Sequence, residues 1–271
     1  MAAPILHDFH MHTIYSRHSS MEMTVPTILH QARDLGLRKI VILEHVPEIS
    51  TRRKEIPEWY KGRNDRSCLD SIAADLAPLQ GELRDLRVYR GVELDADPFT
   101  LDGSVLLDDL SGIDVVVLST HVFPGGDAFW YDPVALPPFA AERVAERWFR
   151  WLLRCVESAP ANILAHPGDL IMARELVPAI QAPKVLAAWE PILKTMARRG
   201  IAFELNELLA TKIKPTYRDK YPALVEFARR CGCKFSVGSD AHQPAKIGRY
   251  KWVPWLIDAA HLTPDDMFDL P

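Results

Sequence analysis

Two pairs of side chains in this sequence have the spacing of metal ligands. His10 and His12 stand two residues apart, and so do Asp240 and His242 near the other end of the chain. In an extended segment, residues two apart point to the same side, so each pair could hold one ion. Neutral imidazole suits Zn, Fe, Mn or Ni, and carboxylates can bridge two cations. The two pairs therefore predict a metal centre with mixed nitrogen and oxygen ligands.

Further candidates stand at the ends of short aliphatic runs between these two pairs. They are His45, Glu93, His121 and His166, together with His18 a few residues after the first pair. Seven of the ten histidines thus recur at one kind of place, which is the reason to interpret them as ligands rather than as isolated core residues. The other three, His7, His30 and His261, are not expected to bind metal.

These positions require elements that bring them together, and the hydrophobic pattern supplies such elements. Short β-branched or aliphatic runs alternate with longer amphipathic segments, which predicts βα units around a parallel sheet. The predicted strands are Pro4–Phe9, Lys39–Leu43, Arg87–Val92, Asp114–Ser119, Asn162–Ala165, Ile201–Leu205 and Lys234–Val237. The predicted helices are Val25–Leu35, Leu69–Leu86, Ala140–Glu157, Lys184–Arg199 and Asp219–Cys231. Because loops converge at the carboxyl ends of barrel strands, the candidate ligands should meet at that rim.

Length and composition favour one α/β barrel domain spanning residues 1–271. The 271 residues suit a barrel, and 48% hydrophobic residues are enough for a sizeable core. A net charge of −4 gives no electrostatic footprint for a nucleic-acid or anionic-membrane partner. The four cysteines form no C-x-x-C pair, and neither a signal peptide nor an apolar run long enough to span a membrane is apparent. We therefore expect a cytoplasmic protein with reduced thiols, and the oligomeric state stays open.

Three connections are longer and richer in Pro, Gly or aromatic residues than a plain βα turn. They are Glu48–Ser67, Val122–Phe139 and Pro167–Pro183. Long connections in compact domains are often functional. The second follows His121 directly and is interpreted either as a lid over the substrate or as a rigid structural loop.

The order of these motifs resembles the PHP family, the polymerase and histidinol phosphatase hydrolases. The matching residues are His10-Met11-His12-Thr13, His18, Glu44-His45, Glu93, Ser119-Thr120-His121, His166-Pro167 and Ser239-Asp240-Ala241-His242. They extend over essentially the whole chain. The resemblance implies a distorted seven-stranded (β/α) barrel that hydrolyses phosphoesters with two or three divalent ions, Zn, Fe or Mn, at the carboxyl rim.

The resemblance also implies three ligand sets. The first is His10, His12, Glu93 and Asp240; the second is His18, His45 and His242; the third is His121 and His166 with Glu93 as a bridge. One departure is Glu44, where the family often has Asp. We expect Glu44 to orient His45 through its second ring nitrogen.

The implied reaction is phosphomonoester hydrolysis by metal-activated water, which requires no covalent nucleophile. Histidinol phosphate is the preferred substrate, because a free-standing chain of this length with extended loops resembles that branch of the family. Nucleotides or a broad range of phosphoesters are the alternative. A non-catalytic metal-binding module and a metal amidohydrolase, which also has an HxH after its first barrel strand, are weaker alternatives.

Substrate contacts are expected from side chains that follow the ligand-bearing strands. The basic candidates for phosphate are Arg17, Arg174, Lys212, Lys214 and Arg249. Asn206 is expected either to contact substrate or to form a turn. Asp8 would either orient a ligand or bind backbone amides. Asp240 and His242 are the candidates for moving the proton that the leaving alcohol needs.

Overall fold

A computed structural model describes residues 5–16, 18–45, 66–82, 85–98, 100–105, 107, 109–124, 138–173 and 175–271. Seven strands form one sheet in sequence order, and every neighbouring pair is parallel. The strands are β1 (His7–Met11), β2 (Lys39–Ile42), β3 (Arg87–Asp95), β4 (Val115–Ser119), β5 (Ile163–Leu164), β6 (Ala202–Asn206) and β7 (Phe235–Gly238). The expected seven-stranded barrel is confirmed.

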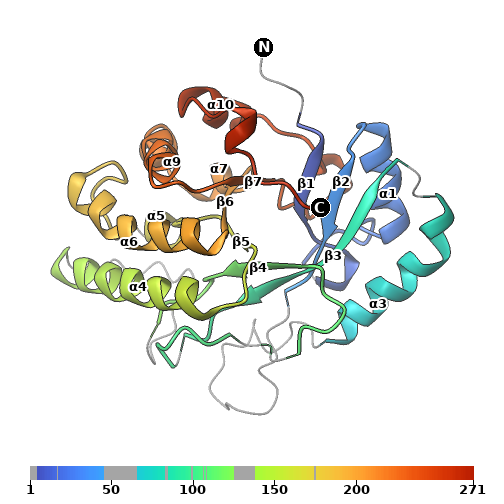
Figure 1. Cartoon of the computed structure of the whole chain (residues 1–271), viewed down its shortest axis with the longest axis horizontal. Coiled ribbons are helices and arrows are strands. Elements are labelled where there is room, and N and C mark those ends of the chain that lie inside the picture. The colour runs from blue at the N-terminus through green and yellow to red at the C-terminus, as the bar shows by residue number, and fades with distance from the viewer. Residues whose placement is uncertain are drawn as a thin grey trace.

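The two edges of the sheet approach each other at the residues that follow β7. The backbone N–H of Asp240 donates to His10 O at 2.8 Å, and that of His12 donates to Ala241 O at 3.1 Å. Figure 1 shows β1 beside β7, with helices arranged around the outside of the strands. This near closure brings the first and last predicted ligand pairs together, although they are more than two hundred residues apart in sequence.

The helices lie where βα units require them. They are α1 (Val25–Asp34), α3 (Ser67–Leu76), α4 (Pro138–Ser158), α5 (Asp169–Ala173), α6 (Pro183–Arg199), α7 (Leu209–Lys212), α8 (Pro215–Arg218), α9 (Tyr221–Arg230) and α10 (Trp252–Ala259). Short 3-10 turns occupy Ile14–Ser16, Ala77–Glu82, Pro244–Lys246 and Pro264–Asp266. All five predicted helices are present.

Some predicted boundaries were wrong, and each has a local reason. The α-helix predicted to reach Leu86 ends at Leu76 and continues as a 3-10 turn, because Pro78 cannot donate the hydrogen bond that an α-helix requires there. β3 continues to Asp95, so Glu93 lies inside a strand rather than after it. Helices α5, α7, α8 and α10 were not predicted, because four to eight residues show too little periodicity.

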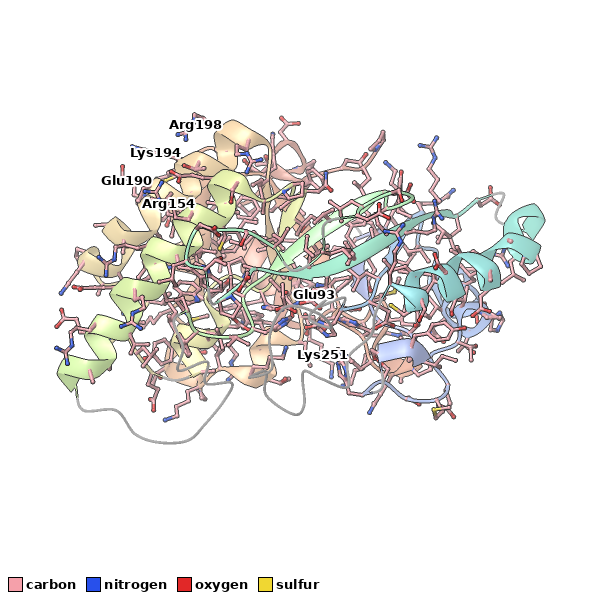
Figure 2. All side chains as sticks on the ribbon, turned by 90° about the horizontal axis from the view of Figure 1, so that it is seen from below. Glu93, Arg154, Glu190, Lys194, Arg198 and Lys251 are labelled. Atoms are coloured by element: carbon pink, nitrogen blue, oxygen red, sulfur yellow. The ribbon has the colours of Figure 1, made fainter. Side chains whose placement is uncertain are left out.

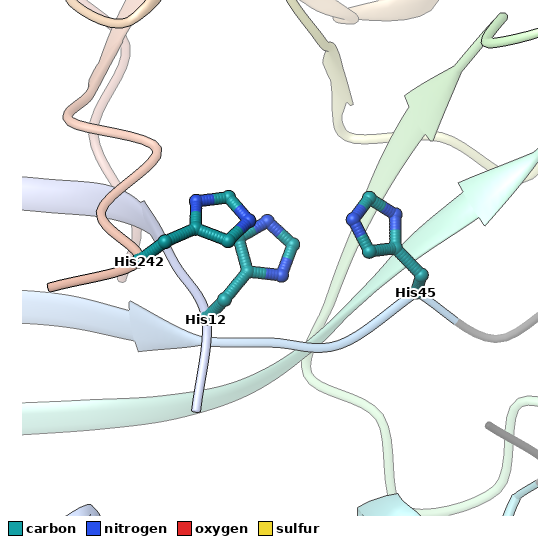
Figure 3. A group of neighbouring side chains, drawn as sticks. All are labelled: His12, His45 and His242. Atoms are coloured by element: carbon teal, nitrogen blue, oxygen red, sulfur yellow. The ribbon is translucent and has the colours of Figure 1, made fainter. Parts of the chain in front are cut away.

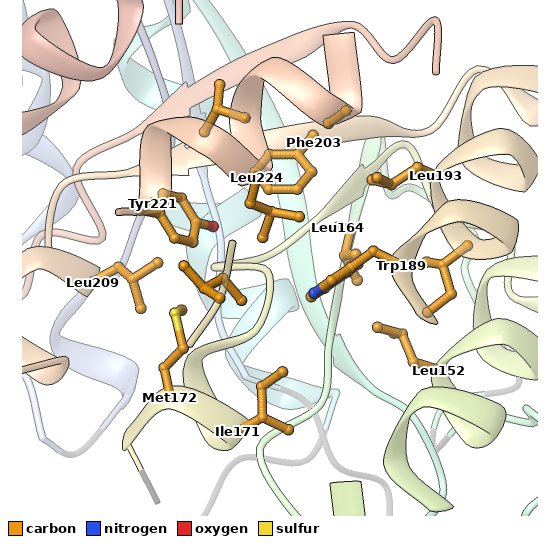
Figure 4. Packing of buried hydrophobic residues seen from close by; sticks show 14 of the residues in the cluster. Leu152, Leu164, Ile171, Met172, Trp189, Leu193, Phe203, Leu209, Tyr221 and Leu224 are labelled. Carbon is orange, nitrogen blue, oxygen red and sulfur yellow. The ribbon is translucent and has the colours of Figure 1, made fainter. Parts of the chain in front are cut away.

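The largest core cluster fixes the second half of the barrel to its outer helices. The Trp189 ring on α6 makes edge contacts with Trp148 and Phe149 on α4, at ring separations of 5.7 and 5.6 Å. Figure 4 shows Trp189 with Phe203 of β6 and Tyr221 of α9 in the same cluster. Interdigitated aromatic packing of this kind holds the strands that carry the site rigidly.

The C-terminal segment covers the amino-terminal end of the barrel. Leu270 is buried in the inner cluster with Phe9 and Val117, and the backbone N–H of Phe268 donates to Phe235 O at 2.8 Å. The candidate site therefore lies at the other end, where the strands finish.

Two expectations about the chain's surroundings can be compared with its structure. No helix in the described ranges is long and apolar enough to cross a membrane. No disulfide joins any of the four cysteines, all of which lie in the described ranges.

Candidate metal centre

Four donor atoms converge at the carboxyl rim, two from strands β1 and β3 and two from the segments that follow β1 and β7. The Nε2 atoms of His10 and His12 lie 3.2 Å apart, and Oε2 of Glu93 lies 3.4 and 3.3 Å from them. Oδ1 of Asp240 lies 3.7 and 3.4 Å from the same two nitrogens. Two ligand atoms at about 2.1 Å from a tetrahedral ion would be separated by about 3.4 Å. The first predicted ligand set therefore has the spacing of a four-coordinate site.

A second group of imidazoles lies beside the first. One ring nitrogen from each of His12, His45 and His242 lies within 4.8 Å of the others, and Figure 3 shows the three rings gathered together. The Nε2 atoms of His18 and His242 are 2.6 Å apart. The structure thus brings together the predicted second set, His18, His45 and His242, and places His12 between it and the first.

The third group shares Glu93 with the first. Oε1 of Glu93 lies 3.0 Å from Nε2 of His121 and 3.1 Å from Nε2 of His166, whereas its Oε2 faces His10 and His12. A carboxylate with one oxygen in each group has the geometry of a bridging ligand.

Three buried carboxylates contact the outer nitrogens of these histidines. The pairs are Glu204 Oε1 with His10 Nδ1 at 2.7 Å, Asp95 Oδ1 with His121 Nδ1 at 2.8 Å, and Asp169 Oδ2 with His166 Nδ1 at 3.1 Å. Such contacts fix the tautomer and the ring orientation, so that Nε2 faces the centre and is more basic.

Sequence reasoning assigned no role to these three carboxylates, although signals for them exist. Asp95 stands two residues after Glu93 in the same strand, so both side chains point to one side. Glu204 lies in the middle of β6, and a buried acid needs a partner. Asp169 begins the short helix that follows His166.

Gly238 makes the contact between Glu204 and His10 possible. A Cβ atom at this position would lie 2.3 Å from Glu204 Oε1 and 2.6 Å from His10 Cβ. Both distances are far below van der Waals contact. Only glycine therefore fits at the end of β7 while the two side chains keep their positions.

Buried negative charge in the centre attracts positive charge. Burial alone would raise the pKa of Glu93, but the neighbouring His45, His121 and His10 hold this pKa well below its usual value. Burial also opposes ionisation of Asp240, and Lys212 and His10 outweigh it, so the pKa of Asp240 is also well below the usual range. Both carboxylates are therefore ionised and available to a cation.

His12 carries a proton where a cation could sit. Burial lowers the pKa of His12, but its contacts with Asp240, Glu44 and Glu93 outweigh burial and raise that pKa to about 10. Buried Oε2 of Glu93 and Nδ1 of His12 have no hydrogen-bond partner. Ions can displace such protons, because metal ligands bind in their deprotonated forms. The donor types, their spacing and these unpartnered atoms fit divalent metal ions.

Backbone strain occurs at two of the predicted ligands. His166 has φ of +27° and Asp240 has φ of +54°, in a region that side chains with a Cβ rarely adopt. Strain of this kind persists where surrounding contacts enforce it, and it is often found at functional sites. Here it aims both side chains into the rim.

The centre opens into a pocket of about 910 Å³. Its lining includes His18, His45, Asp240 and His242, and the predicted phosphate-binding residues Lys212 and Arg249. Nζ of Lys212 lies 3.4 Å from Oδ2 of Asp240, so this cation stands directly beside the candidate ligands.

Other expected substrate contacts are placed differently. Arg17 and Arg174 lie outside the described residues, as does most of the lid candidate Val122–Phe139. Lys214 is exposed, forms an ion pair with Glu175 and is absent from the described pocket lining.

Asn206 is fully buried and its polar atoms are used internally. Its Nδ2 donates to Glu204 Oε2 at 3.0 Å, and its Oδ1 accepts from the N–H of Leu209 at 2.9 Å, at the start of α7. This placement matches the turn-forming interpretation and does not support the expected contact with substrate.

Two carboxylates near the first ligand pair bind backbone amides. Asp8 accepts from the N–H groups of Ser239 and Gly248 at 2.9 and 3.0 Å, which is the backbone interpretation. The expected role of Glu44 was wrong. Its Oε1 accepts from Thr13 N at 2.7 Å and its Oε2 lies 3.8 Å from His12 Nδ1, so its carboxylate faces the segment after β1 rather than His45.

Comparisons with known proteins support the fold and show the family. A histidinol phosphate phosphatase from Lactococcus lactis, solved with zinc, L-histidinol and phosphate, has a TM-score of 0.67 at 19% identity, over 95% of this chain and 94% of that one. A structure from Listeria monocytogenes has a TM-score of 0.71 at 19% identity, over 90% and 97%. These two likenesses show the fold.

Sequence comparison shows the family. A "Probable phosphatase" from Shewanella piezotolerans is 24% identical over 252 residues, covering 93% of this chain and 84% of that protein. The model of the PHP domain matches residues 8–208, from the first strand to the loop after β6. The chain therefore belongs to the PHP family.

Proposed function

We propose that this PHP-family phosphatase hydrolyses the monoester of a small phosphorylated metabolite, with residues 1–271 acting as one catalytic domain. The observation that supports the proposal most directly is the arrangement of Glu93. One of its oxygens lies 3.3–3.4 Å from the paired nitrogens of His10 and His12, and the other lies 3.0–3.1 Å from His121 and His166. A bridged set of this kind suits hydrolysis at two or more ions.

The proposed ligands are the nine residues that converge at the rim. His10, His12, Glu93 and Asp240 would hold one ion, His18, His45 and His242 a second, and Glu93, His121 and His166 a third. Imidazole and carboxylate donors suit Zn, Fe or Mn. When bound, such ions supply an acidified water at neutral pH and charge neutralisation for the phosphoryl oxygens.

The chain's own groups bind the phosphate and move the proton. Lys212, beside Asp240, neutralises one phosphoryl oxygen. Oδ2 of Asp240 faces Lys212 and Asn206 at the edge of the centre, and we assign it the transfer of a proton from the attacking water to the leaving alcohol. His242, with its Nδ1 held against the carbonyl of Asp240 at 2.9 Å, presents Nε2 to the centre.

Histidinol phosphate is the first candidate substrate. The Lactococcus lactis protein of the same fold binds histidinol and phosphate, which supports this choice. Nucleotides are the second candidate, because the pocket of about 910 Å³ is large and carries several basic residues.

The proposal is tested by reconstituting metal-stripped protein with Zn, Mn or Fe(II) and measuring phosphate release. The substrates are histidinol phosphate, nucleoside monophosphates and an aryl phosphate, and His10→Ala is the inactive control. We expect turnover of at least one metabolite in the reconstituted wild type only. Metal-loaded protein that is inert towards every phosphoester would instead favour a non-catalytic metal-binding module.

A further inference from the structure

Three basic side chains line the pocket without an acidic partner. Lys246, Arg249 and Lys251 are exposed and belong to the same lining as the candidate ligands Asp240 and His242. Figure 2 labels Lys251 and Glu93, both of which line this pocket. Within the described part of the chain, none of the three basic residues forms an ion pair. These three positive charges line one pocket although the whole chain has a net charge of −4.

The segment that carries them is held in place by buried contacts. Ile247 is fully buried in a core cluster, and the N–H of Gly248 donates to Oδ2 of Asp8 at 3.0 Å. The N–H of Lys251 donates to Oε1 of Glu207 at 2.9 Å. The backbone that carries the three cations is therefore fixed, and we call this segment, residues 246–251, the basic wall. Binding of a ligand to it requires little additional ordering of the backbone.

Within the described lining, no acidic side chain forms an ion pair with these cations. Apart from the candidate ligands Glu93 and Asp240, Glu207 is the one acidic residue of that lining. Its two oxygens accept the N–H groups of Lys251, Trp252 and Val253 at 2.9–3.0 Å, at the start of α10. Glu207 thus binds backbone donors, and the charged groups of Lys246, Arg249 and Lys251 are left for a ligand.

We propose that Lys246, Arg249 and Lys251 form a second anion subsite, and that the substrate carries a second phosphate or carboxylate apart from the scissile phosphate. The inference rests on the proposed function, since Lys212 and the metal centre take the scissile group. A pocket of about 910 Å³ lies in the upper part of the range of about 300–1,000 Å³ for small-molecule sites. It has room for a ligand with two charged ends.

The subsite also discriminates between the candidate substrates. Histidinol phosphate carries an ammonium group, which the three cations would repel. A substrate with a second anion gains charge-assisted hydrogen bonds at the same place. Metabolites with a second phosphate or carboxylate should therefore bind better than histidinol phosphate or a nucleoside monophosphate, whose one phosphate is the scissile group.

Binding of non-hydrolysable analogues tests the subsite independently of turnover. Zinc-reconstituted protein is titrated calorimetrically with alkane bisphosphonates and with hydroxyalkyl phosphonates of three to six carbons. We expect the best bisphosphonate to bind about tenfold more tightly than its matched monophosphonate. The advantage should shrink as NaCl is raised, because salt screens exposed charges. Equal affinity for both ligands at every length would overturn the subsite.

Substitutions in the basic wall test whether its side chains cause the preference for bisphosphonates. The double variant Lys246→Gln with Lys251→Gln should lower the bisphosphonate preference to about twofold. Lys194→Gln is the matched control, since Lys194 pairs with Glu190 on α6, away from Glu93 in Figure 2. A preference retained in the double variant contradicts the assignment. Absence of phosphate release from every ester, with the binding preference intact, would contradict the proposed function and leave the subsite supported.

Discussion

Oε1 of Glu204 lies 2.7 Å from Nδ1 of His10, and both side chains are buried. The other oxygen of the same carboxylate accepts the backbone N–H of His166 at 2.6 Å and Nδ2 of Asn206 at 3.0 Å. Glu204 therefore connects a candidate ligand of the first group with one of the third. It touches neither group's inner nitrogens, so its role is to position them.

Replacing this carboxylate tests the positioning role. Glu204→Gln keeps the size of the side chain but removes the charge that orients His10. We expect zinc affinity, measured by calorimetric titration of metal-stripped protein, to fall about 10- to 100-fold. Glu190→Gln, on the exposed surface of α6, should leave it unchanged. Wild-type zinc affinity in Glu204→Gln would show that the contact is incidental.

Gly238→Ala should damage the same contact from the other side. The new Cβ would lie 2.3 Å from Glu204 Oε1 and 2.6 Å from His10 Cβ, so one of the two side chains must move. We expect the zinc affinity to fall and the unfolding free energy to drop by about 1–3 kcal/mol, as for an overpacked core. Gly81→Ala is the control, because no atom lies within 4 Å of its added Cβ. Equal zinc titrations and melting curves for both variants would contradict the steric reason.

The spacing of histidines was sufficient to predict the rim, because side-chain alternation and the convergence of parallel strands are local and general rules. His10, His12 and His45 could be placed at strand ends without knowing how the barrel closes. The partnership of Glu204 with His10 could not, since it depends on β6 and β1 meeting across Gly238.

The basic wall, too, could be predicted from the sequence only in part. Arg249 was expected near phosphate from its place after the last strand, and it lines the pocket. Lys246 and Lys251 follow the same strand, but their place in the sequence did not single them out. Their position depends on the anchoring of Gly248 by Asp8, a contact between residues 240 positions apart. Long-range hydrogen bonds of this kind leave no periodic trace in the sequence.

His7 should make the fold sensitive to acid. Burial lowers its pKa to about 4, and the nearby Lys39 adds to this while Asp269 opposes it. Because the unfolded chain binds the proton more tightly, the stability contributed by neutral His7 is complete above pH 6.5 and is lost as the pH falls towards 4. The loss reaches about 3 kcal/mol.

The substitution His7→Phe isolates this effect. It keeps a ring stacked on Phe9, whose centroid lies 4.4 Å from that of His7, and it removes the titration. The difference in unfolding free energy between wild type and variant, measured by urea denaturation from pH 7 to 4, should shift in favour of the variant on acidification. Parallel pH profiles would mean that His7 keeps its ordinary pKa.

Metal dependence of turnover tests the central claim most directly. Divalent metal is titrated into metal-stripped protein while phosphate release from its best substrate is followed, in wild type and in Glu93→Gln. Activity should rise from near zero and saturate at two or three equivalents in the wild type. It should stay at least about a hundredfold lower in the variant, which loses the charge of the bridging carboxylate. Phosphate release by the metal-stripped wild type at the full rate, or unchanged turnover in Glu93→Gln, would contradict a metal-dependent phosphatase built on this centre.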